Sequence, residues 1–562
     1  MEFLRTQGRR IVNESGEEVI LQGFGMGNWM NQEGFLFGSS VFSTEFGDFV
    51  RAEKMDRGRS INQTIVELCG REYADAFWKK WYRNYFGEAD IRDIAERGMN
   101  SARLPLNAKV FLKEEPGIVY DEEMFGLLDQ VIDWCEKYRL YVILDMHAAA
   151  AGQSGLLCDD GVDNIPHLYI DEESWERTML LWEKLAGRYA DRSVVAGYDL
   201  LNEPLALGRW DCYLSKLQKF YEEAVRRIRK VDRKHIFFLE GHRFASRNDI
   251  FHKDMDPECG NWALAMHMYE SWPDLGVMGP ILASSEELGV PVWMGETGGS
   301  PEWMTTLYEM LYENHIGVNI WCQKAVEDAD AAALCTFKVP EGFEEVRNYA
   351  HHGGAKPGYE KSIRIFDQML ENIKFENCQV HEERSAAILR SPGVTVPAVG
   401  YDMMPGAGVS FQGSYPYCVF CGYRREDRMH LVYEKGFMPY ESTAFAFAAA
   451  GRPPKYGDWT HLELMLEETD FACYTVRRVE KDVKMILECR AEADSELEVT
   501  VRGEKRIVAV SAGEEMRQAA AGVVPAGEDT AVKVCCVKGR VVLRSVRFDV
   551  ASISDRFFVR TI

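Results

Sequence analysis

Residues 194–205 read VVAGYDLLNEPL, a run of β-branched and large apolar residues that ends at Asn202-Glu203-Pro204. A strand exposed on one face alternates apolar and polar residues, whereas this run is nearly continuous, which is typical of a parallel strand covered on both faces. Asn and Glu before Pro are also ordinary residues for a turn or the first step of a helix. The run therefore predicts a buried parallel strand, and the role of the carboxylate at its end depends on the rest of the chain.

Similar runs recur along the first part of the chain. They are EVILQGFGM (18–26), SARLPL (101–106), YVILDMH (141–147), HIFFLEG (235–241), WALAMHMY (262–269), VPVWMGE (290–296) and GVNIWC (317–322). Apolar residues three and four positions apart predict helices at 89–98, 124–138, 174–189, 212–231 and 361–373. Eight β-α units close into a (β/α)8 TIM barrel, and an open doubly wound sheet is the alternative.

Two further segments flank this pattern. RRIVNESGEEVIL, ahead of the first strand, predicts a hairpin around Ser15-Gly16 that closes the bottom of the barrel. After about residue 376 the segments become short and β-branched, with turn residues between them, which is typical of an all-β jelly-roll sandwich. We therefore expect two domains. Residues 1–376 form the (β/α)8 catalytic barrel together with its N-terminal hairpin, and residues 377–562 form a β-sandwich domain.

Composition limits the kinds of partner. The 562 residues carry a formal net charge of -24, which argues against nucleic acid and anionic membranes, because both favour positive surfaces. The N-terminus lacks the apolar stretch of a signal peptide, and no apolar run reaches the roughly 18 residues of a membrane span, so we expect a cytoplasmic protein. The 14 Cys are scattered, and the pair Cys418 and Cys421 has no second pair or His cluster at zinc-site spacing, so we expect neither disulfides nor a metal.

The ends of the predicted strands carry the polar side chains. They are Arg103, His147, Asn202, Glu203, His267, Tyr269, Glu296 and Trp321. In a barrel these ends meet at one face, so the two glutamates would face each other, as cleavage of a glycosidic bond requires. Carboxyl groups ~5 to 5.5 Å apart would predict retention, and ~6.5 to 9.5 Å would predict inversion. Each residue alone is an ordinary core or turn residue, so the inference depends on the whole set.

These strand ends resemble glycoside hydrolase family 5, in the clan of retaining (β/α)8 glycosidases. LLNEP resembles the acid/base motif and WMGETGG the nucleophile motif, which implies these roles for Glu203 and Glu296. The resemblance further implies that Arg103 and Tyr269 keep Glu296 ionised and that Asn202 binds the sugar 2-hydroxyl. It implies that His147 and His267 hold other hydroxyls or the nucleophile, that Trp321 is the stacking floor, and that no cofactor is needed.

Other stretches are similar to the exo-β-1,3-glucanase-like branch of that family. In GNWMNQEGFL, Trp29 matches the Gly-x-Trp segment and Glu33 the acid placed on the terminal sugar, although Glu33 could equally be a solvated loop acid. LDMHAAAAGQSG resembles the third-strand loop of that branch but has AAAAGQSG in place of a more Pro- and Asn-rich sequence, which leaves the linkage and the sugar preference open. The C-terminal part resembles carbohydrate-binding modules of families 6 and 35. Its loop aromatics could stack on sugars or pack internally; they are Tyr415, Tyr417, Tyr423, Tyr456 and Trp459.

The sequence therefore predicts a retaining, exo-acting β-glycosidase, a β-glucosidase or exo-β-1,3-glucosidase that acts on oligosaccharides or small glycosides. The alternatives are an endo-β-glucanase, an enzyme that releases a disaccharide from plant glycosides, and a non-catalytic carbohydrate-binding protein. A nucleotide-dependent glycosyltransferase is disfavoured because no phosphate-binding Gly-rich motif follows a strand. The sequence leaves open whether the protein forms a homo-oligomer.

Overall fold

The computed structural model describes residues 1–39, 54–269, 271–329, 331–416, 423–437 and 459–550. The chain divides into two compact units. The first consists of Met1–Met268, Pro280–Gly298 and Ile316–Val380, and the second of Tyr269–Gly279, Gly299–His315 and His381–Ile562. The second unit thus takes two short segments from the region that the sequence assigned to the barrel, besides the C-terminal part.

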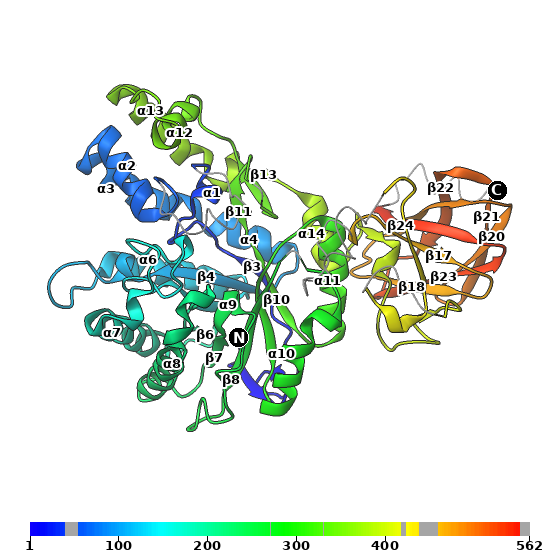
Figure 1. Cartoon of the computed structure of the whole chain (residues 1–562), viewed down its shortest axis with the longest axis horizontal. Coiled ribbons are helices and arrows are strands. Elements are labelled where there is room, and N and C mark those ends of the chain that lie inside the picture. The colour runs from blue at the N-terminus through cyan, green and yellow to red at the C-terminus, as the bar shows by residue number, and fades with distance from the viewer. Residues whose placement is uncertain (40–53, 270, 330, 417–422, 438–458, 551–562) are drawn as a thin grey trace. The chain divides into compact units, whose positions relative to one another are not determined.

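The first unit contains a closed barrel of eight parallel strands, which confirms the TIM barrel and excludes an open sheet (Figure 1). The strands are β3 (Gln22–Gly25), β4 (Ser101–Asn107), β5 (Tyr141–Ala148), β6 (Val195–Asp199), β7 (Ile236–Glu240), β8 (Trp262–Met268), β9 (Val292–Thr297) and β10 (Gly317–Trp321). Each overlaps one predicted run. β10 pairs with β3, so the sheet closes on itself and places all the strand ends that follow the apolar runs at one face.

Amphipathic helices surround these strands, at or near the predicted positions. They are α4 (Glu88–Glu96), α6 (Glu122–Lys137), α7 (Glu172–Tyr189), α8 (Leu214–Ile228) and α13 (Tyr359–Asn372). Aspartates start two of them: Asp121 accepts from the backbone N–H of Met124, and Asp171 from those of Glu173 and Ser174. The long connection after β3 forms α2 (Gly58–Cys69) and α3 (Arg71–Tyr85), in which Trp81 and Phe77 are buried.

The N-terminal segment folds against the end of the barrel at which the strands begin. β1 (Arg5–Gln7) and β2 (Arg10–Val12) pair around Gly8, one turn earlier than the sequence predicted. The predicted reversal at Ser15-Gly16 is also present, with an isolated bridge between Val12 and Glu18. Leu4 and Ile11 pack with the buried side chains of the barrel interior, so this segment covers the end of the barrel that precedes the strands.

The second unit contains two antiparallel sheets, as the sequence predicted. One has the order β16-β17-β24-β19-β22, with β14 also on β24: β14 (Thr395–Pro397), β16 (His430–Tyr433), β17 (Leu462–Leu466), β19 (Val483–Ala491), β22 (Gly513–Val524) and β24 (Val541–Val550). The other has the order β15-β18-β23-β20-β21: β15 (Phe411–Gln412), β18 (Phe471–Val476), β20 (Ser495–Val501), β21 (Glu504–Val510) and β23 (Thr530–Lys538). Every second residue of β19 is buried, the pattern of a strand that packs one face on a core.

The predicted sugar-stacking aromatics of this unit are partly accounted for. Tyr423 and Trp459 are buried and pack edge to face, so they belong to the core. Tyr415 stacks on His430, with ring centroids 3.9 Å apart. Tyr417 and Tyr456, like Cys418 and Cys421, lie outside the described residues. Carbohydrate binding by this unit stays a prediction.

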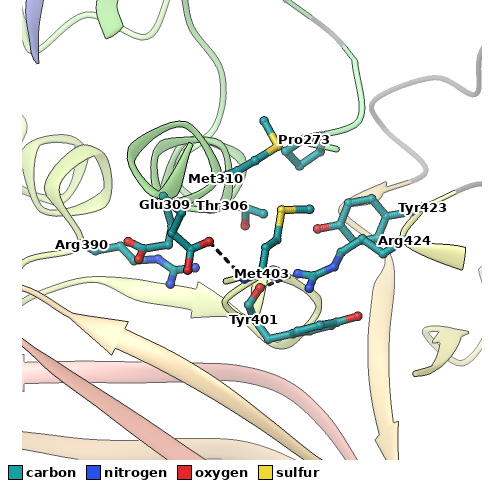
Figure 2. A pocket seen from close by; sticks show the side chains of 10 residues that line it. Pro273, Thr306, Glu309, Met310, Arg390, Tyr401, Met403, Tyr423 and Arg424 are labelled. Atoms are coloured by element: carbon teal, nitrogen blue, oxygen red, sulfur yellow. Dashed lines mark hydrogen bonds between the residues drawn. The ribbon is translucent and has the colours of Figure 1, made fainter. Parts of the chain in front are cut away.

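Helix α11 (Pro301–Glu313) belongs to the second unit and is fixed there by buried polar contacts. Arg390 Nε donates to Thr305 O (3.1 Å), Arg477 Nε to Glu309 Oε2 (3.1 Å), and the backbone N–H of Met403 to Glu313 Oε2 (3.1 Å). Figure 2 shows the small cavity beside these residues, with Glu309, Arg390 and Tyr401 on its wall. Its volume of about 10 Å³ admits no more than a water-sized molecule, so it is not a sugar site.

Within the described ranges, none of the helices combines the length and the apolar composition that a membrane crossing needs.

Candidate active site

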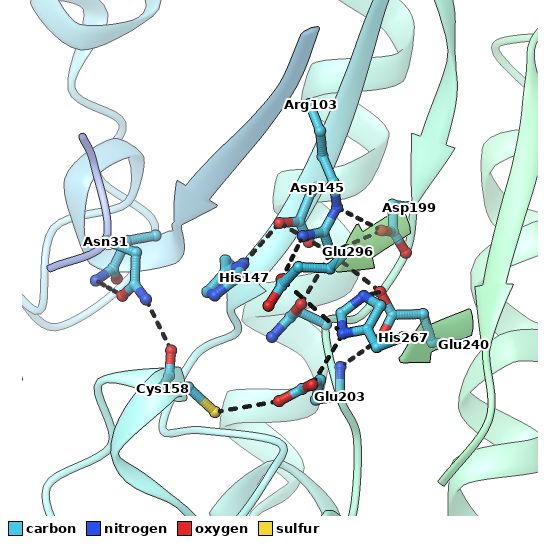
Figure 3. Close-up of polar contacts among 12 residues, drawn as sticks. Asn31, Arg103, Asp145, His147, Cys158, Asp199, Glu203, Glu240, His267 and Glu296 are labelled. Carbon is cyan, nitrogen blue, oxygen red and sulfur yellow. Dashed lines mark hydrogen bonds and ion pairs between the residues drawn. The ribbon is translucent and has the colours of Figure 1, made fainter. Parts of the chain in front are cut away.

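The two predicted catalytic glutamates come together at the strand ends. Glu203 lies just beyond β6, and Glu296 is on β9. Both are nearly buried, with exposed fractions of 9% and 7%. One carboxylate oxygen of each lies within 4.8 Å of the other, in the group drawn in Figure 3. Oxygens this close fit the ~5 to 5.5 Å between the carboxyl groups of a retaining pair better than the ~6.5 to 9.5 Å of an inverting pair.

Arg103 on β4 lies among the carboxylates and is fully buried. Its Nη1 donates to Glu296 Oε2 (3.0 Å), and its Nη2 donates to Asn202 Oδ1 (2.8 Å). Arginine stays charged under all ordinary conditions, so a permanent positive charge faces the proposed nucleophile. Because Arg103 has only donors, the Asn202 atom that it meets is the oxygen, and the amide nitrogen of Asn202 is directed elsewhere.

His267 on β8 bridges the pair. Its Nδ1 lies 2.8 Å from Glu203 Oε1 and 3.9 Å from Glu296 Oε2. Burial disfavours the charged ring, but the carboxylates of Glu240 and Glu296 and the contact with Glu203 outweigh it and raise the pKa of His267 well above its ordinary value. A charged His267 therefore accompanies the two glutamates.

The electrostatics suit Glu203 for the acid role. Burial is the main effect that raises the pKa of Glu203, and repulsion by Glu296 and Glu240 adds to it, while the contact with His267 opposes it. A carboxyl group with a raised pKa can still hold its proton when the substrate needs it. The asymmetry between the two glutamates, one beside a guanidinium and one with a raised pKa, matches one nucleophile and one acid.

His147 and Trp321 form one wall of the site. Their rings stack with centroids 5.0 Å apart, and His147 Nδ1 lies 2.7 Å from Asp145 Oδ2. The glycines of GFGMG make room for the indole: a Cβ on Gly25 would lie 2.7 Å from Trp321 Cε3, and one on Gly27 2.9 Å from Cζ2. Larger residues at these two positions would displace the Trp321 ring.

Glu33 joins the same site from the connection after β3. It is 7% exposed, and its buried Oε2 has no hydrogen-bond partner among the described residues. Burial is the main cause that raises the pKa of Glu33 to about 8; Glu296 and Glu203 add to it, while His147 and a hydrogen bond with Trp321 oppose it. Glu33 is therefore not a solvated loop acid but a buried one that has a spare oxygen.

Two predicted substrate-binding residues, Trp29 and Tyr269, are placed differently from the site residues described above. Trp29 is fully buried, and its indole N–H donates to Tyr82 O (2.8 Å), so it packs beneath the connection, and its role in binding stays a prediction. Tyr269 directly follows β8, is 38% exposed and is assigned to the second unit. Its proposed contact with Glu296 stays a prediction.

Four residues near the pair were missed by the sequence analysis. They are Asp145, Cys158, Asp199 and Glu240. Arg103 Nη2 lies 3.2 Å from Asp145, 2.9 Å from Asp199 and 3.0 Å from Glu240. Cys158 Sγ lies 4.0 Å from Glu203 Oε2. The signal for the three acids was present, because each is a lone carboxylate in an otherwise apolar strand, where an unpaired charge would be costly.

Glu203, His267 and Glu296 also offer the donor atoms of a cation site. The guanidinium of Arg103 already contacts Glu296 at 3.0 Å and would repel a cation there. The set therefore fits acid-base chemistry by the carboxylates better than metal binding.

A larger cavity, of about 620 Å³, lies in the first unit. Its walls come mainly from the connections after β4 and β5, including Asn107, Lys109, Asp160 and Arg177. Neither glutamate is among its lining residues. Arg59 pairs there with Glu114 and Lys109 with Asp160, and the cavity holds no facing pair of glutamates comparable to Glu203 and Glu296 among its lining residues.

A (β/α)8 barrel with a close, buried carboxylate pair at its strand ends defines the class of barrel glycoside hydrolases. Residues 56–326 match the family Cellulase (glycosyl hydrolase family 5). This match to the family model, over residues 56–326, agrees with the resemblance found in the LLNEP and WMGETGG motifs.

Three relatives show the range of this similarity. A β-xylosidase of Phanerodontia chrysosporium is 32% identical over 315 residues, or 53% of this chain and 62% of that protein. A probable glucan 1,3-β-glucosidase A of Emericella nidulans is 32% identical over 213 residues, or 37% and 48%. Endoglucanase C of Acetivibrio thermocellus is 28% identical over 176 residues, or 31% and 48%. The matches span roughly half of these relatives' lengths, so we treat the activity of the whole chain as a proposal.

Proposed function

We propose that the chain is a retaining β-glycosidase in which Glu203 is the acid/base and Glu296 the nucleophile. The observation that carries this proposal is the separation of at most 4.8 Å between their oxygens. Glu296 would form a bond to the anomeric carbon as the bond to the leaving oxygen breaks, and that oxygen would take the proton of Glu203. Water, giving a proton back to Glu203, would then displace Glu296 and restore the original anomeric configuration.

The neighbouring side chains have matching roles in this proposal. With its oxygen held by Arg103, Asn202 has its amide nitrogen left to donate to a sugar hydroxyl, here the 2-hydroxyl. Trp321 offers a ring face for the sugar, and His147, fixed by Asp145, can bind another hydroxyl. These residues hold the sugar so that its anomeric carbon lies between the two glutamates.

The anomer released first tests this mechanism. We expect proton NMR of the hydrolysis of a short β-1,3-linked glucose oligosaccharide to show single glucose units that appear initially as the β-anomer, because two displacements at one carbon preserve its configuration. Initial release of the α-anomer would contradict the retaining mechanism. Internal fragments would instead favour the endo-β-glucanase alternative, and release of a disaccharide the other exo alternative.

We propose exo action because of Glu33. A buried carboxyl group with an unpartnered oxygen, placed against Trp321 and within the electrostatic reach of both glutamates, is suited to bind hydroxyls of a terminal sugar. A sugar in the middle of a polymer has linkages where a terminal sugar has hydroxyls. An acid that demands hydroxyls therefore selects the chain end.

Replacing Glu33 by alanine should then lower kcat/KM for β-glucosides. Removing the carboxyl group would leave a buried sugar hydroxyl without its partner, which costs about 1–3 kcal/mol and corresponds to roughly 5- to 150-fold. Initial rates at low substrate concentration measure this, with Glu287→Ala, at an exposed position of α10 (Leu275–Leu288), as the control that keeps wild-type rates. An unchanged kcat/KM in Glu33→Ala would remove the support for exo action.

For the cleaved sugar we propose β-linked glucose or xylose. Relatives are named as a glucan 1,3-β-glucosidase and a β-xylosidase, and these two sugars differ only in the hydroxymethyl group. Rates with 4-nitrophenyl β-glucoside and β-xyloside distinguish them. A lack of hydrolysis of any β-glycoside by the folded protein would favour the non-catalytic carbohydrate-binding alternative.

The remaining predictions on cellular context are part of this proposal. We propose that the protein acts in the cytoplasm on small β-glycosides and oligosaccharides, without a cofactor and without nucleic-acid or membrane partners. The net charge of -24 supports the last point. Self-association into a homo-oligomer stays a prediction, for which light scattering is the direct measurement.

A further inference from the structure

Glu240 touches the groups around both proposed catalytic glutamates. It ends β7 and is fully buried, and its backbone oxygen accepts from Tyr221 Oη (2.7 Å). Its Oε2 accepts from the backbone N–H of Glu203 (2.7 Å). Its Oε1 lies 3.0 Å from Arg103 Nη2 and 3.1 Å from His267 Nε2. One carboxylate thus connects the acid/base, the histidine beside it and the arginine beside the nucleophile, as Figure 3 shows.

The charge of Glu240 determines where His267 carries its protons. Burial disfavours the charged carboxylate, but His267 and Arg103 outweigh it and lower the pKa of Glu240 to about 2. Nε2 of His267 lies at an ion-pair distance of 3.1 Å from Glu240 Oε1 but forms no hydrogen bond among the described residues, and an ionised carboxylate at this distance favours a proton on that nitrogen. Glu240 therefore favours a proton on Nε2, and the state of Nδ1, which faces Glu203, depends on the total charge of the ring.

We propose that Glu240 is a positioning residue that keeps His267 protonated on both nitrogens, so that Nδ1–H binds Glu203 Oε1 and the proton to be transferred lies on Glu203 Oε2. This inference rests on the acid/base role proposed for Glu203. With a neutral His267, Nδ1 would accept the proton from Glu203 and compete with the leaving group for it. The charge of Glu240 removes that competition.

The surroundings of Glu203 agree with this assignment. Among the described residues, the contact recorded for Oε2 is the Cys158 thiol at 4.0 Å, so Oε2 is the oxygen left for a substrate. The backbone of Glu203 adopts a left-handed conformation, with φ of 42°. Its N–H bond to Glu240 holds that unusual conformation and thereby the direction of the side chain.

The other charged groups of the cluster do not replace Glu240. Burial, and then repulsion by Glu240, raises the pKa of Asp199 well above its ordinary value, whereas the pKa of Glu240 is lowered, so the negative charge is favoured on Glu240. Asp145 is engaged with His147 and Arg103, and Glu296 Oε2 is farther from His267 Nδ1, at 3.9 Å. Glu240 is thus the anion in closest contact with the far side of the imidazole.

The variant Glu240→Gln separates the charge from the backbone contact. Its side-chain oxygen can still accept from the N–H of Glu203, whereas the negative charge is gone. We expect kcat/KM for phenyl β-glucoside, whose leaving group needs the proton, to fall on the order of 10²-fold. The activated 2,4-dinitrophenyl β-glucoside, which leaves without that help, should lose far less. The alkaline limb of the pH profile should move to lower pH, because removal of an anion makes the Glu203–His267 pair release its proton more readily.

Two further variants serve as controls. Asp256→Asn removes another buried acid of the first unit, the partner of Arg229 at 2.8 Å, and should leave the ratio of the two substrates and the pH limb unchanged. Glu240→Asp keeps the charge and should keep the wild-type ratio even if both rates fall.

Equal losses on both substrates in Glu240→Gln, with an unmoved pH limb, would overturn the inference and leave Glu240 a structural contact. If Glu240→Gln does not fold, a widened ratio in Glu240→Asp would overturn it. Failure of the wild-type protein to hydrolyse either substrate would count against the proposed function, which these ratios do not test.

Discussion

Replacing Glu296 by glycine is expected to abolish hydrolysis of β-glycosides while the barrel stays folded. Without this carboxylate no bond to the anomeric carbon can form, and we expect kcat to fall by about 10⁴-fold or more, or roughly 5 kcal/mol of barrier. The fold should survive because Arg103, the buried partner of Glu296, keeps Asp145, Asp199 and Glu240 as neighbours. Initial rates on an aryl β-glucoside, together with circular dichroism, measure both outcomes.

Added azide should give the Glu296→Gly variant a product that can be detected directly. The small anion can enter the space left by the carboxylate, form the C–N bond to the anomeric carbon and expel the leaving group, which takes the proton of Glu203. A single displacement inverts the configuration, so the product from a β-glucoside should be the α-glucosyl azide. Glu302→Gln, an exposed change in the first turn of α11, is the matched control and should hydrolyse at the wild-type rate. Wild-type turnover in folded Glu296→Gly would exclude Glu296 as the nucleophile.

The barrel could be read from the sequence because its strands are buried on both faces. A run such as 194–201 has almost no polar residue, so neither a surface strand nor an amphipathic helix explains it. The N-terminal hairpin was harder: Gly8 and Gly16 both permit a tight turn, with φ of 58° and 82°, and only the packing of Leu4 and Ile11 under the barrel shows which turn joins regular strands.

The site was predictable where a side chain stands in a recognisable motif and less so where an acid stands alone in an apolar strand. Glu203 and Glu296 stand in recognisable motifs, whereas Glu240 in HIFFLEG could have pointed inward or outward. Its direction depends on barrel register, and its importance on Arg103 and His267, which come from distant parts of the chain. Trp29 shows a different difficulty, because an aromatic residue near a strand end can bind a ligand or pack internally, and the sequence does not show that Trp29 is buried beside Tyr82.

Replacing Glu203 by alanine is expected to slow the hydrolysis of some substrates much more than others, depending on whether the leaving group needs a proton. Phenyl β-glucoside needs the proton, so its hydrolysis should slow by about 10²- to 10⁴-fold. 2,4-Dinitrophenyl β-glucoside should still form the glycosyl-enzyme, but water is then no longer activated, so a burst of dinitrophenol should precede a slow steady state. Because Glu203 must be protonated to act and its pKa is raised, wild-type activity should fall as the pH rises through that value, and the variant should lack this limb.

Azide also distinguishes the acid/base from the nucleophile. The azide product of the Glu203 variant should have the β-configuration, opposite to that expected for Glu296→Gly. In Glu203→Ala the nucleophile is intact, so azide would attack the glycosyl-enzyme after the first displacement and give the β-glucosyl azide with faster turnover. The wild-type protein in the same azide solution is the control and should release mainly free sugar, because its base favours water. An α-azide from this variant would indicate that Glu203 is the nucleophile and Glu296 the acid/base. Full activity on phenyl β-glucoside with the alkaline limb intact would mean that another group donates the proton, since alanine at 203 cannot.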